Sequence, residues 1–307
     1  MTATATAKAA GGTAPPLRWE HRACHLCGAD ETDLYHRERL AYFERQVEFR
    51  IVRCRRCGLV YTDPRLRDHN GPYLLASGAD AGEIERHARA KRKVFERALG
   101  EIERRGGRAA GGRLLDVGCG TGHFLALARE RGYEVLGLEP AAVPARYARD
   151  VLRLPVEPRD ITGADFPAER FAVITAWDVI EHLADPREML RRCVVWLRPG
   201  GVLALRFPSS TWQRLKAVLL HRLLRLDRPV FAPTIHLYFF DEQTFSRLAR
   251  QAGLEVLRVR GTPLEPNADG PGLNALKRAG NLILEGVEGI GGRPLGNLEA
   301  YCRKVRA

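Results

Sequence analysis

The 307-residue sequence contains no apolar run of about 18 residues or more, the length that a membrane-spanning helix needs. It also lacks a charged-then-apolar signal layout. Its start, MTATATAKAAGGTAPP, is low-complexity sequence of mostly small residues, and we expect a disordered tail over 1–20. Seven cysteines without a secretory signal are typical of the reducing cytoplasm, where paired thiols bind metal more often than they form disulfides. We therefore expect a cytoplasmic protein.

The positive charge is concentrated in one stretch. The formal net charge is +12, and residues 86–113 alone hold ten basic and three acidic residues, a net charge of +7. A solvated helix face is one interpretation of this stretch, and a site for an anionic partner is the other. Apolar residues repeat along one face over 91–105, which predicts a helix. These residues are Val94, Phe95, Ala98, Leu99 and Ile102.

Composition changes predict the domain organisation. A cysteine module of short strands over 21–70 precedes a helical linker over 71–112, and the glycine-rich GGRAAGGR leads into a main domain over 113–307. There, strand-like runs alternate with helical patterns, which favours an α/β fold with a doubly wound, mostly parallel, Rossmann-like sheet. The expected strands are 113–118, 134–139, a short one near 155, 171–177, 201–207, 254–261 and 298–305.

A glycine turn indicates the ligand class. The run LLDVGCGTGHFL joins a buried strand to a helix that begins near His123. Backbone without Cβ atoms lets a ligand approach closely, and the start of the helix offers unpaired N–H groups. A dinucleotide fingerprint, G-x-G-x-x-G, would need glycine at position 123, so that fingerprint is absent. The three glycines present are Gly118, Gly120 and Gly122.

This D-x-G-x-G-x-G turn resembles the nucleotide loop of class I S-adenosylmethionine-dependent methyltransferases. Further blocks extend the resemblance over about residues 90–261: GLEP, RDI, FAVITAWDVIEHLADP and LRPGGVLALRFP. The resemblance implies that Glu139 accepts both ribose hydroxyls, that Asp160 and Ile161 contact adenine, and that Asp116 holds the methionine ammonium. The implied cofactor residues are Asp116, Gly118, Gly120, Gly122, Glu139, Asp160, Ile161 and Trp177.

Two C-x-x-C knuckles in the N-terminal module predict a structural zinc site. Each knuckle is followed by glycine, and four thiolates on paired tight turns match a closed tetrahedral site. Chance cysteines and a redox pair are the alternatives. A zinc ribbon before a methyltransferase domain resembles bacterial enzymes that act on sugars, cell-surface glycans and secondary metabolites. The predicted ligands are Cys24, Cys27, Cys54 and Cys57.

The catalytic candidates come from WDVIEHLADP and a later histidine. Asp178, Glu181 and His182 have i, i+3, i+4 spacing and would share one face if the turn is helical. The string resembles one that, joined by a later histidine, binds a divalent metal in ubiquinone-pathway O-methyltransferases and in small-RNA 2′-O-methyltransferases. The later histidine of this sequence would be His236. Three interpretations stay open: a Mg²⁺, Mn²⁺ or Zn²⁺ site, a metal-free base at His182 or His236, and a purely structural role.

The segment between the fifth strand and His236 is an insertion over 209–236. Its apolar residues fall on a broad face over 212–228, with arginines and a lysine around it. A lid over the pocket, an amphipathic helix that contacts a membrane surface, and ordinary core packing are the three interpretations.

Together these features predict an S-adenosylmethionine-dependent methyltransferase. We expect O-methylation of a small-molecule acceptor such as a glycan, a nucleotide-sugar or a natural-product intermediate. The alternatives are RNA methylation, which the charge favours although no RNA-binding module is recognisable, C-methylation of a sugar, and a non-catalytic protein that senses S-adenosylmethionine.

Overall fold

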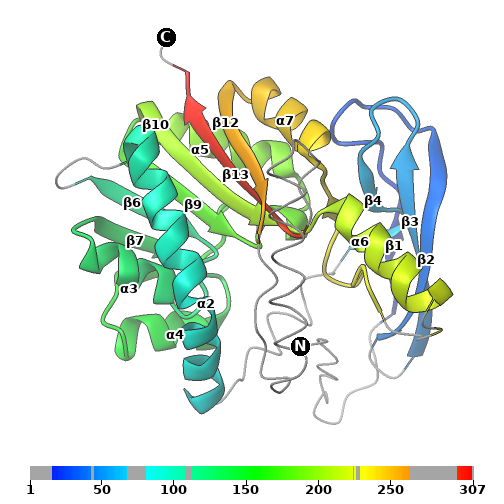
Figure 1. The fold of residues 1–307 in the computed structure, drawn as a ribbon, viewed down its shortest axis with the longest axis horizontal. Coiled ribbons are helices and arrows are strands. Elements are labelled where there is room, and N and C mark those ends of the chain that lie inside the picture. The colour runs from blue at the N-terminus through cyan, green and yellow to red at the C-terminus, as the bar shows by residue number, and fades with distance from the viewer. Residues whose placement is uncertain are drawn as a thin grey trace.

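A seven-stranded sheet forms the centre of the main domain (Figure 1). The computed structural model describes residues 16–42, 45–67, 81–107, 112–223, 225, 229–262 and 296–305. The strands are β6 (Arg113–Val117), β7 (Glu134–Leu138), β8 (Val156–Glu157), β9 (Phe171–Trp177), β10 (Leu197–Phe207), β12 (Leu254–Gly261) and β13 (Leu298–Lys304). Their order is β12-β13-β10-β9-β6-β7-β8, and only β13 runs antiparallel to its neighbours. The predicted fold class is confirmed.

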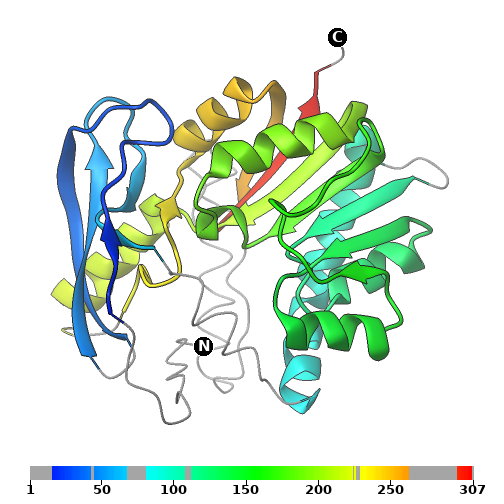
Figure 2. The same cartoon turned by 180° about the vertical axis from the view of Figure 1, so that it is seen from behind.

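Helices cover both faces of this sheet (Figures 1 and 2). One face carries α2 (Ala81–Ile102), α3 (His123–Glu130) and α4 (Ala142–Asp150), and the other carries α5 (Pro186–Trp196) and α7 (Glu242–Gln251). Successive strand residues alternate between the two cores. Leu114 and Val173 pack on the α2 side, whereas Leu115 and Ile174 pack on the α5 side. Because helices cover both faces of the sheet, the sequences of these strands are nearly continuous apolar runs.

Helix α2 lies within the predicted helical linker over 71–112 and packs on the main domain. It begins at Ala81, earlier than expected, and its apolar face packs on the sheet and on α3. Residues 71–80 and 108–111 of the predicted linker lie outside the described residues. The buried residues of the helix are Phe95, Ala98, Leu99 and Ile102, while Val94 is half-buried.

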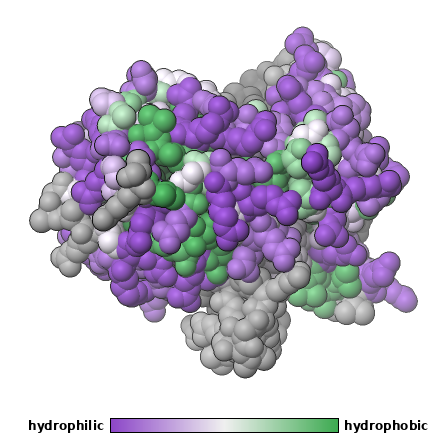
Figure 3. Space-filling model, turned by 90° about the horizontal axis from the view of Figure 1, so that it is seen from above, coloured by the Kyte–Doolittle hydropathy of each residue, from purple (hydrophilic) through white to green (hydrophobic). Residues whose placement is uncertain are grey.

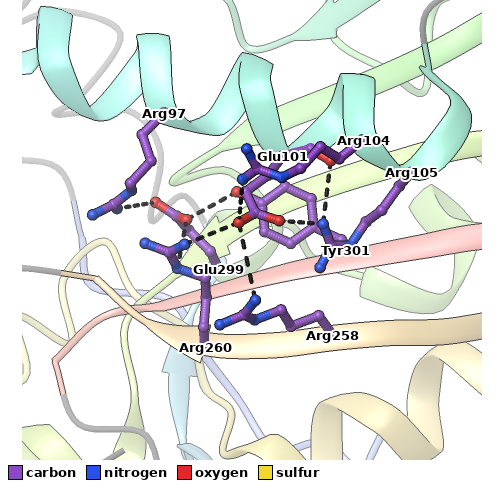
Figure 4. A network of polar contacts seen from close by, with 8 residues as sticks. All are labelled: Arg97, Glu101, Arg104, Arg105, Arg258, Arg260, Glu299 and Tyr301. Atoms are coloured by element: carbon purple, nitrogen blue, oxygen red, sulfur yellow. Dashed lines mark hydrogen bonds and ion pairs between the residues drawn. The ribbon is translucent and has the colours of Figure 1, made fainter. Parts of the chain in front are cut away.

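Arginines and two buried glutamates join α2 and its C-terminal turn η1 (Glu103–Gly107) to the antiparallel edge of the sheet (Figure 4). Glu101, near the end of α2, pairs with two arginines of η1 and two of β12. Glu299 of β13 pairs with Arg97 and Arg260 and accepts a hydrogen bond from Tyr301. Three of the ten basic residues over 86–113, namely Arg97, Arg104 and Arg105, are therefore paired within the chain, and the choice between a solvated helix face and an anionic partner stays a prediction.

The N-terminal module shares a sheet with the main domain (Figures 1 and 2). Its strands are β1 (Trp19–Glu20), β2 (Thr32–Tyr42), β3 (Arg45–Cys54), β4 (Val60–Thr62) and β5 (Arg65–Leu66). Strands β2 to β4 form an antiparallel sheet, which β11 (Tyr238–Phe239) of the main domain completes in the order β11-β4-β3-β2. β1 pairs with β5, so the tail predicted over 1–20 is too long at its C-terminal end; residues 1–15 lie outside the described residues.

The insertion over 209–236 forms α6 (Ser210–Ala217), a π-helical turn η3 (Val218–Leu223) and an irregular return. This segment lies beside β2 and β3 of the module (Figure 1). Leu215, Val218 and Leu219 are exposed, so membrane contact through 212–228 stays a prediction; residues 224 and 226–228 lie outside the described residues. Seen from above, apolar residues form separate patches on a mostly hydrophilic surface (Figure 3). Among the described residues, no helix combines the length and apolarity that crossing a membrane requires.

Candidate functional site

A cavity of about 660 Å³ lies at the carboxyl ends of β6, β7 and β9. Open α/β sheets bind their ligands at this edge, and the volume lies in the range of about 300–1,000 Å³ that is usual for small-molecule pockets. None of the described residues before Ile84 lines it. Of the predicted site residues, Gly122 and Glu181 do not line it, whereas these do: Asp116, Gly118, Gly120, Glu139, Asp160, Ile161, Trp177, Asp178, His182 and His236.

The three positions of the turn require glycine for different physical reasons. A Cβ atom on Gly118 would lie 2.6 Å from Val179 Cγ2, and one on Gly122 would lie 2.6 Å from a Leu154 methyl carbon. These two glycines therefore permit close packing. A Cβ on Gly120 would meet no atom within 4 Å, although its φ of +54° favours glycine. Gly120 is thus the position where bare backbone faces open space within the cavity.

Glu139 is fixed against this turn. Its carboxylate accepts one hydrogen bond from the Gly120 N–H and one from the Ala141 N–H, each with an N–O distance of 2.8 Å. The side chain is 1% exposed, and burial raises its pKa. The second strand therefore brings a carboxylate into contact with the glycine turn, as the resemblance implied.

The remaining predicted cofactor residues are brought to the same cavity. Asp116 is buried and accepts a 2.6 Å hydrogen bond from the Thr175 hydroxyl, and burial, reinforced by the charge of Glu139, raises its pKa to about 8. Asp160 caps its own turn by accepting from the Thr162 N–H and hydroxyl and from the Gly163 N–H. Trp177 stacks edge-on against Phe124 at the cavity wall.

Two histidines at the other end of the cavity have the same polar arrangement. The Nδ1 atom of His182 lies 2.9 Å from the Ile235 carbonyl, and that of His236 lies 3.0 Å from the Phe231 carbonyl. Because a carbonyl only accepts, each ring in its neutral form carries its N–H at Nδ1 and its lone pair at Nε2. The ring centroids are 4.9 Å apart. This tautomer is the one that a metal ligand bonding through Nε2 requires.

Glu181 completes this cluster. It lies in the short 3₁₀ helix η2 (Ile180–His182), is 1% exposed, and neither carboxylate oxygen has a hydrogen-bond partner among the described residues. Burial, and then the charge of Asp178, raise its pKa well above the ordinary value. One donor atom each from Glu181, His182 and His236 lie within 4.8 Å of one another.

Asp178 does not share the face of Glu181 and His182, so that prediction is wrong. The turn is not helical at this residue, whose φ is +58°. Its carboxylate is held by Arg206 of β10, with one N–O distance of 2.9 Å, and Lys91 of α2 lies 3.8 Å away. Burial opposes ionisation, but the charges of Arg206 and Lys91 outweigh it and lower the pKa of Asp178 to about 2. Asp178 lines the cavity as a paired carboxylate outside the cluster.

The two C-x-x-C knuckles meet, as predicted. The Sγ atoms of Cys24 and Cys57 are 3.4 Å apart, those of Cys27 and Cys54 are 3.5 Å apart, and all four lie within 4.8 Å of one another. In each knuckle, the N–H of the following glycine donates to the carbonyl of the first cysteine. All four thiols are free, with no disulfide between them.

The family model described as a methyltransferase domain matches residues 85–259, which is more than half of the chain. The chain belongs to this family. The predicted methyltransferase family is thereby confirmed.

This methyltransferase is similar to several curated proteins over part of its length. It is 36% identical over 108 residues to a ubiquinone biosynthesis O-methyltransferase of Nitrobacter winogradskyi, covering 34% of this chain and 41% of that protein. Over 125 residues it is 30% identical to the enzyme of the same name from Bradyrhizobium diazoefficiens, covering 39% of this chain and 48% of that protein. The match thus spans less than half the length of these relatives.

Solved structures share the fold of this methyltransferase. A chain from the complex between the Haloferax volcanii Trm112 methyltransferase activator and a methyltransferase superposes with a TM-score of 0.54 at 17% identity, covering 78% of this chain and 98% of that chain. An S-adenosylmethionine-dependent methyltransferase from Listeria monocytogenes superposes with a TM-score of 0.51 at 13% identity, covering 72% of this chain and 99% of that chain.

Two residues of the site were missed from the sequence. Arg206 is 3% exposed, although it is charged, and it is the next-to-last residue of the apolar strand GVLALRF. A charge within a buried strand was a usable signal, because such a group needs a partner. Lys91 had no such signal, since it was one of many cations on α2.

Proposed function

We propose that this methyltransferase O-methylates a small-molecule acceptor, using a divalent cation held by Glu181, His182 and His236. The observation that carries the proposal is the cluster itself: a buried carboxylate without a hydrogen-bond partner faces two imidazoles whose Nδ1 atoms are already engaged. The curated relatives are O-methyltransferases, which supports the same reaction class.

S-adenosylmethionine would bind over Gly120. The open space at this residue suits a ligand that approaches the backbone, and the Glu139 carboxylate beside it retains acceptor capacity for ribose hydroxyls, because each oxygen has two lone pairs. Asp116 would hold the methionine ammonium, whose positive charge stabilises the ionised carboxylate at this buried position. Asp160, Ile161 and Trp177 would line the adenine end and the cavity wall.

The donor set fits a divalent cation better than a metal-free base. Burial raises the pKa of Glu181, which means that its charged form is costly there, and a cation would stabilise that form. Burial, together with the neighbouring His182, lowers the pKa of His236 to about 3, which keeps the ring neutral. A neutral imidazole is what a metal needs, whereas a base must accept a proton.

The chain's residues would orient the two substrates for an in-line transfer. When bound, the cation would lower the pKa of an acceptor hydroxyl and position it. Transfer would form a bond between the acceptor oxygen and the methyl carbon, break the carbon–sulfur bond of the donor and release the hydroxyl proton. S-adenosylhomocysteine and a methyl ether are the products. Trp177 and Phe124 would exclude water from the reacting carbon.

The N-terminal cysteine cluster would hold a structural zinc ion. Four free thiols on two tight turns match the four-sulfur tetrahedral site, and the ion would stabilise the turns that join the short strands of the module. Replacing Cys54 by Ser should release the zinc, and an unaltered zinc content would exclude this site.

The test uses purified full-length protein, labelled S-adenosylmethionine, and a panel of phenols, polyols, glycans and nucleotide-sugars. We expect labelled product, loss of activity on chelation, and recovery with Mg²⁺ or Mn²⁺, cations that thiolate sites bind poorly. His182→Ala should abolish transfer, whereas the exposed His21→Ala should not.

Other outcomes would select other functions. Activity that survives exhaustive chelation while His182→Ala stays inactive would select a metal-free base. Tight cofactor binding without turnover on any acceptor would favour a sensor. Turnover on RNA that falls steeply with salt would favour RNA methylation.

A further inference from the structure

The second histidine of the cluster lies in a segment without regular secondary structure. His236 sits between the end of η3 and β11, in a turn closed by the Ile235 and His236 N–H groups, which both donate to the Ala232 carbonyl. A loop of this kind does not fix a side chain by itself, so its position depends on what holds the loop.

Glu38 of the N-terminal module holds the start of this loop. It lies on β2, is 5% exposed, and its carboxylate accepts hydrogen bonds from the N–H groups of Val230 and Phe231, the latter at 2.8 Å. The carbonyl of Phe231 is the group that engages Nδ1 of His236. Glu38 is therefore two hydrogen bonds away from the imidazole, although 198 positions separate it from His236 in the chain.

Thr62 holds the end of the loop. Its hydroxyl donates to the His236 carbonyl at 3.0 Å, and its N–H donates to the Leu237 carbonyl at 2.9 Å. From there, β11 pairs with β4 in register, Tyr238 opposite Tyr61. The Leu237 N–H in turn donates to the Glu181 carbonyl, so the same loop also reaches η2.

We infer that the N-terminal module acts in catalysis as a clamp on His236, with Glu38 and Thr62 as positioning residues. The module contributes no residue to the cavity wall within the described chain, so its effect on the reaction passes through the loop that it grips. The cysteine knuckle at 54–57 lies directly before β4, and an ion bound there would stiffen the strand that carries Thr62. This inference rests on the proposed cation site.

Binding of Mn²⁺ to the zinc-loaded full-length protein tests the clamp. Outer partners of metal ligands typically contribute about 10- to 100-fold in metal affinity. We expect Glu38→Gln, which turns one acceptor oxygen into a donor that cannot accept from the loop, to weaken Mn²⁺ binding by about that factor. Thr62→Val, which keeps the shape and loses the hydroxyl, should weaken it by a smaller factor. Glu48→Gln is the matched control, because Glu48 of β3 is exposed and pairs, among the described residues, with Arg37 and Arg39 of β2.

The affinity for S-adenosylmethionine separates positioning from general damage. Glu38→Gln and Thr62→Val should leave it unchanged, since the contacts that hold Glu139 against Gly120 involve neither residue nor the loop. If Glu38→Gln fails to fold, Thr62→Val carries the test. Wild-type Mn²⁺ affinity in both variants would overturn the clamp while leaving the cation site in place. Wild-type protein that binds no Mn²⁺ would overturn the cation site and the clamp with it.

Discussion

Two buried glutamates of this protein lie in opposite electrostatic surroundings. Glu299, which is 0% exposed, accepts from Arg97 at 3.0 Å and from the Tyr301 hydroxyl at 2.9 Å, and Arg260 lies 3.5 Å away (Figure 4). Glu181, which is 1% exposed, has no hydrogen-bond partner for either oxygen within the described chain. Taking a carboxylate out of water costs several kcal/mol unless a charge compensates it.

The difference shows how the fold separates structural from functional charge. At the α2–β13 junction the protein supplies its own cations, so the buried carboxylates there fasten a helix to a sheet edge. Beside the cavity the nearest donor groups to Glu181 are the imidazoles of His182 and His236, and burial raises the pKa of Glu181, so a cation from outside the chain would stabilise its charged form. The other buried carboxylates beside the cavity and the loop, those of Asp116, Glu139 and Glu38, each accept hydrogen bonds, so the unsatisfied oxygens of Glu181 point to a ligand.

The largest expected effect is on catalysis. Glu181→Gln keeps the shape of the side chain but removes the charge that would hold the cation. Because loss of an outer partner already costs about 10- to 100-fold, we expect methyl transfer to fall by at least about 100-fold. Glu299→Gln, assayed below its unfolding temperature, should keep wild-type activity per folded molecule. Equal losses in both variants would remove the distinction between the two glutamates.

For the free energy of unfolding, we expect the larger effect at Glu299 and the smaller effect at Glu181. We expect Glu299→Met to lower the free energy of unfolding by about 3–5 kcal/mol, because it strands two arginines at a buried junction. Glu181→Met should leave it within about 1 kcal/mol of wild type, or raise it, in metal-free buffer, because it removes a charge that nothing pairs. Urea unfolding followed by circular dichroism gives both values. A large loss in Glu181→Met would mean that the chain itself compensates this carboxylate.

A divalent cation should stabilise only the protein that keeps Glu181. At a free Mn²⁺ concentration of 100 times the dissociation constant, linkage predicts about 2.7 kcal/mol of added stability for the wild type. Thermal unfolding with and without Mn²⁺ measures it. Glu181→Gln should show little of this shift and Glu299→Gln all of it, and a shift that Glu181→Gln retains would place the cation elsewhere.

The smallest expected effect is a pH dependence at the arginine junction. Burial works to raise the pKa of Glu101, but hydrogen bonding to Arg104 and the charges of Arg105 and Arg104 outweigh it, so the pKa lies below 4.5. A lowered pKa stabilises the fold above the unfolded value and loses that contribution as the pH falls through the folded value. We expect Glu101→Gln to destabilise the protein at pH 7 by about 1 kcal/mol and the difference to shrink below pH 4. A pH-independent difference would contradict the ion-pair account.

The sequence was sufficient for the fold and for the contact between the glycine turn and Glu139, because those features depend on local patterns. Strand runs, helix starts and the glycine turn each occupy a few consecutive residues, and their order along the chain determines the parallel sheet. Glu139 reaches Gly120 for the same reason: both follow adjacent strands.

The positions of Asp178 and His236 depend on contacts with residues far away in the sequence, which a local sequence pattern does not predict. The i, i+3, i+4 spacing of Asp178, Glu181 and His182 favoured one shared face, but Arg206, 28 residues later, draws Asp178 away. The residues that hold His236 in place are as distant: Glu38 meets Phe231 across 193 residues. Such pairings arise only when two parts of the chain fold against each other.

The shared strand pairing of β4 and β11 also sets an order of events on the ribosome. Thr62 is synthesised 176 residues before Tyr238, so at about 5–20 residues per second the inner edge of β4 waits for roughly 10–35 s without its neighbour. An open edge of this kind invites pairing with other nascent chains. Expression of the first 67 residues alone should therefore give an aggregation-prone fragment, whereas the whole chain closes that edge from within.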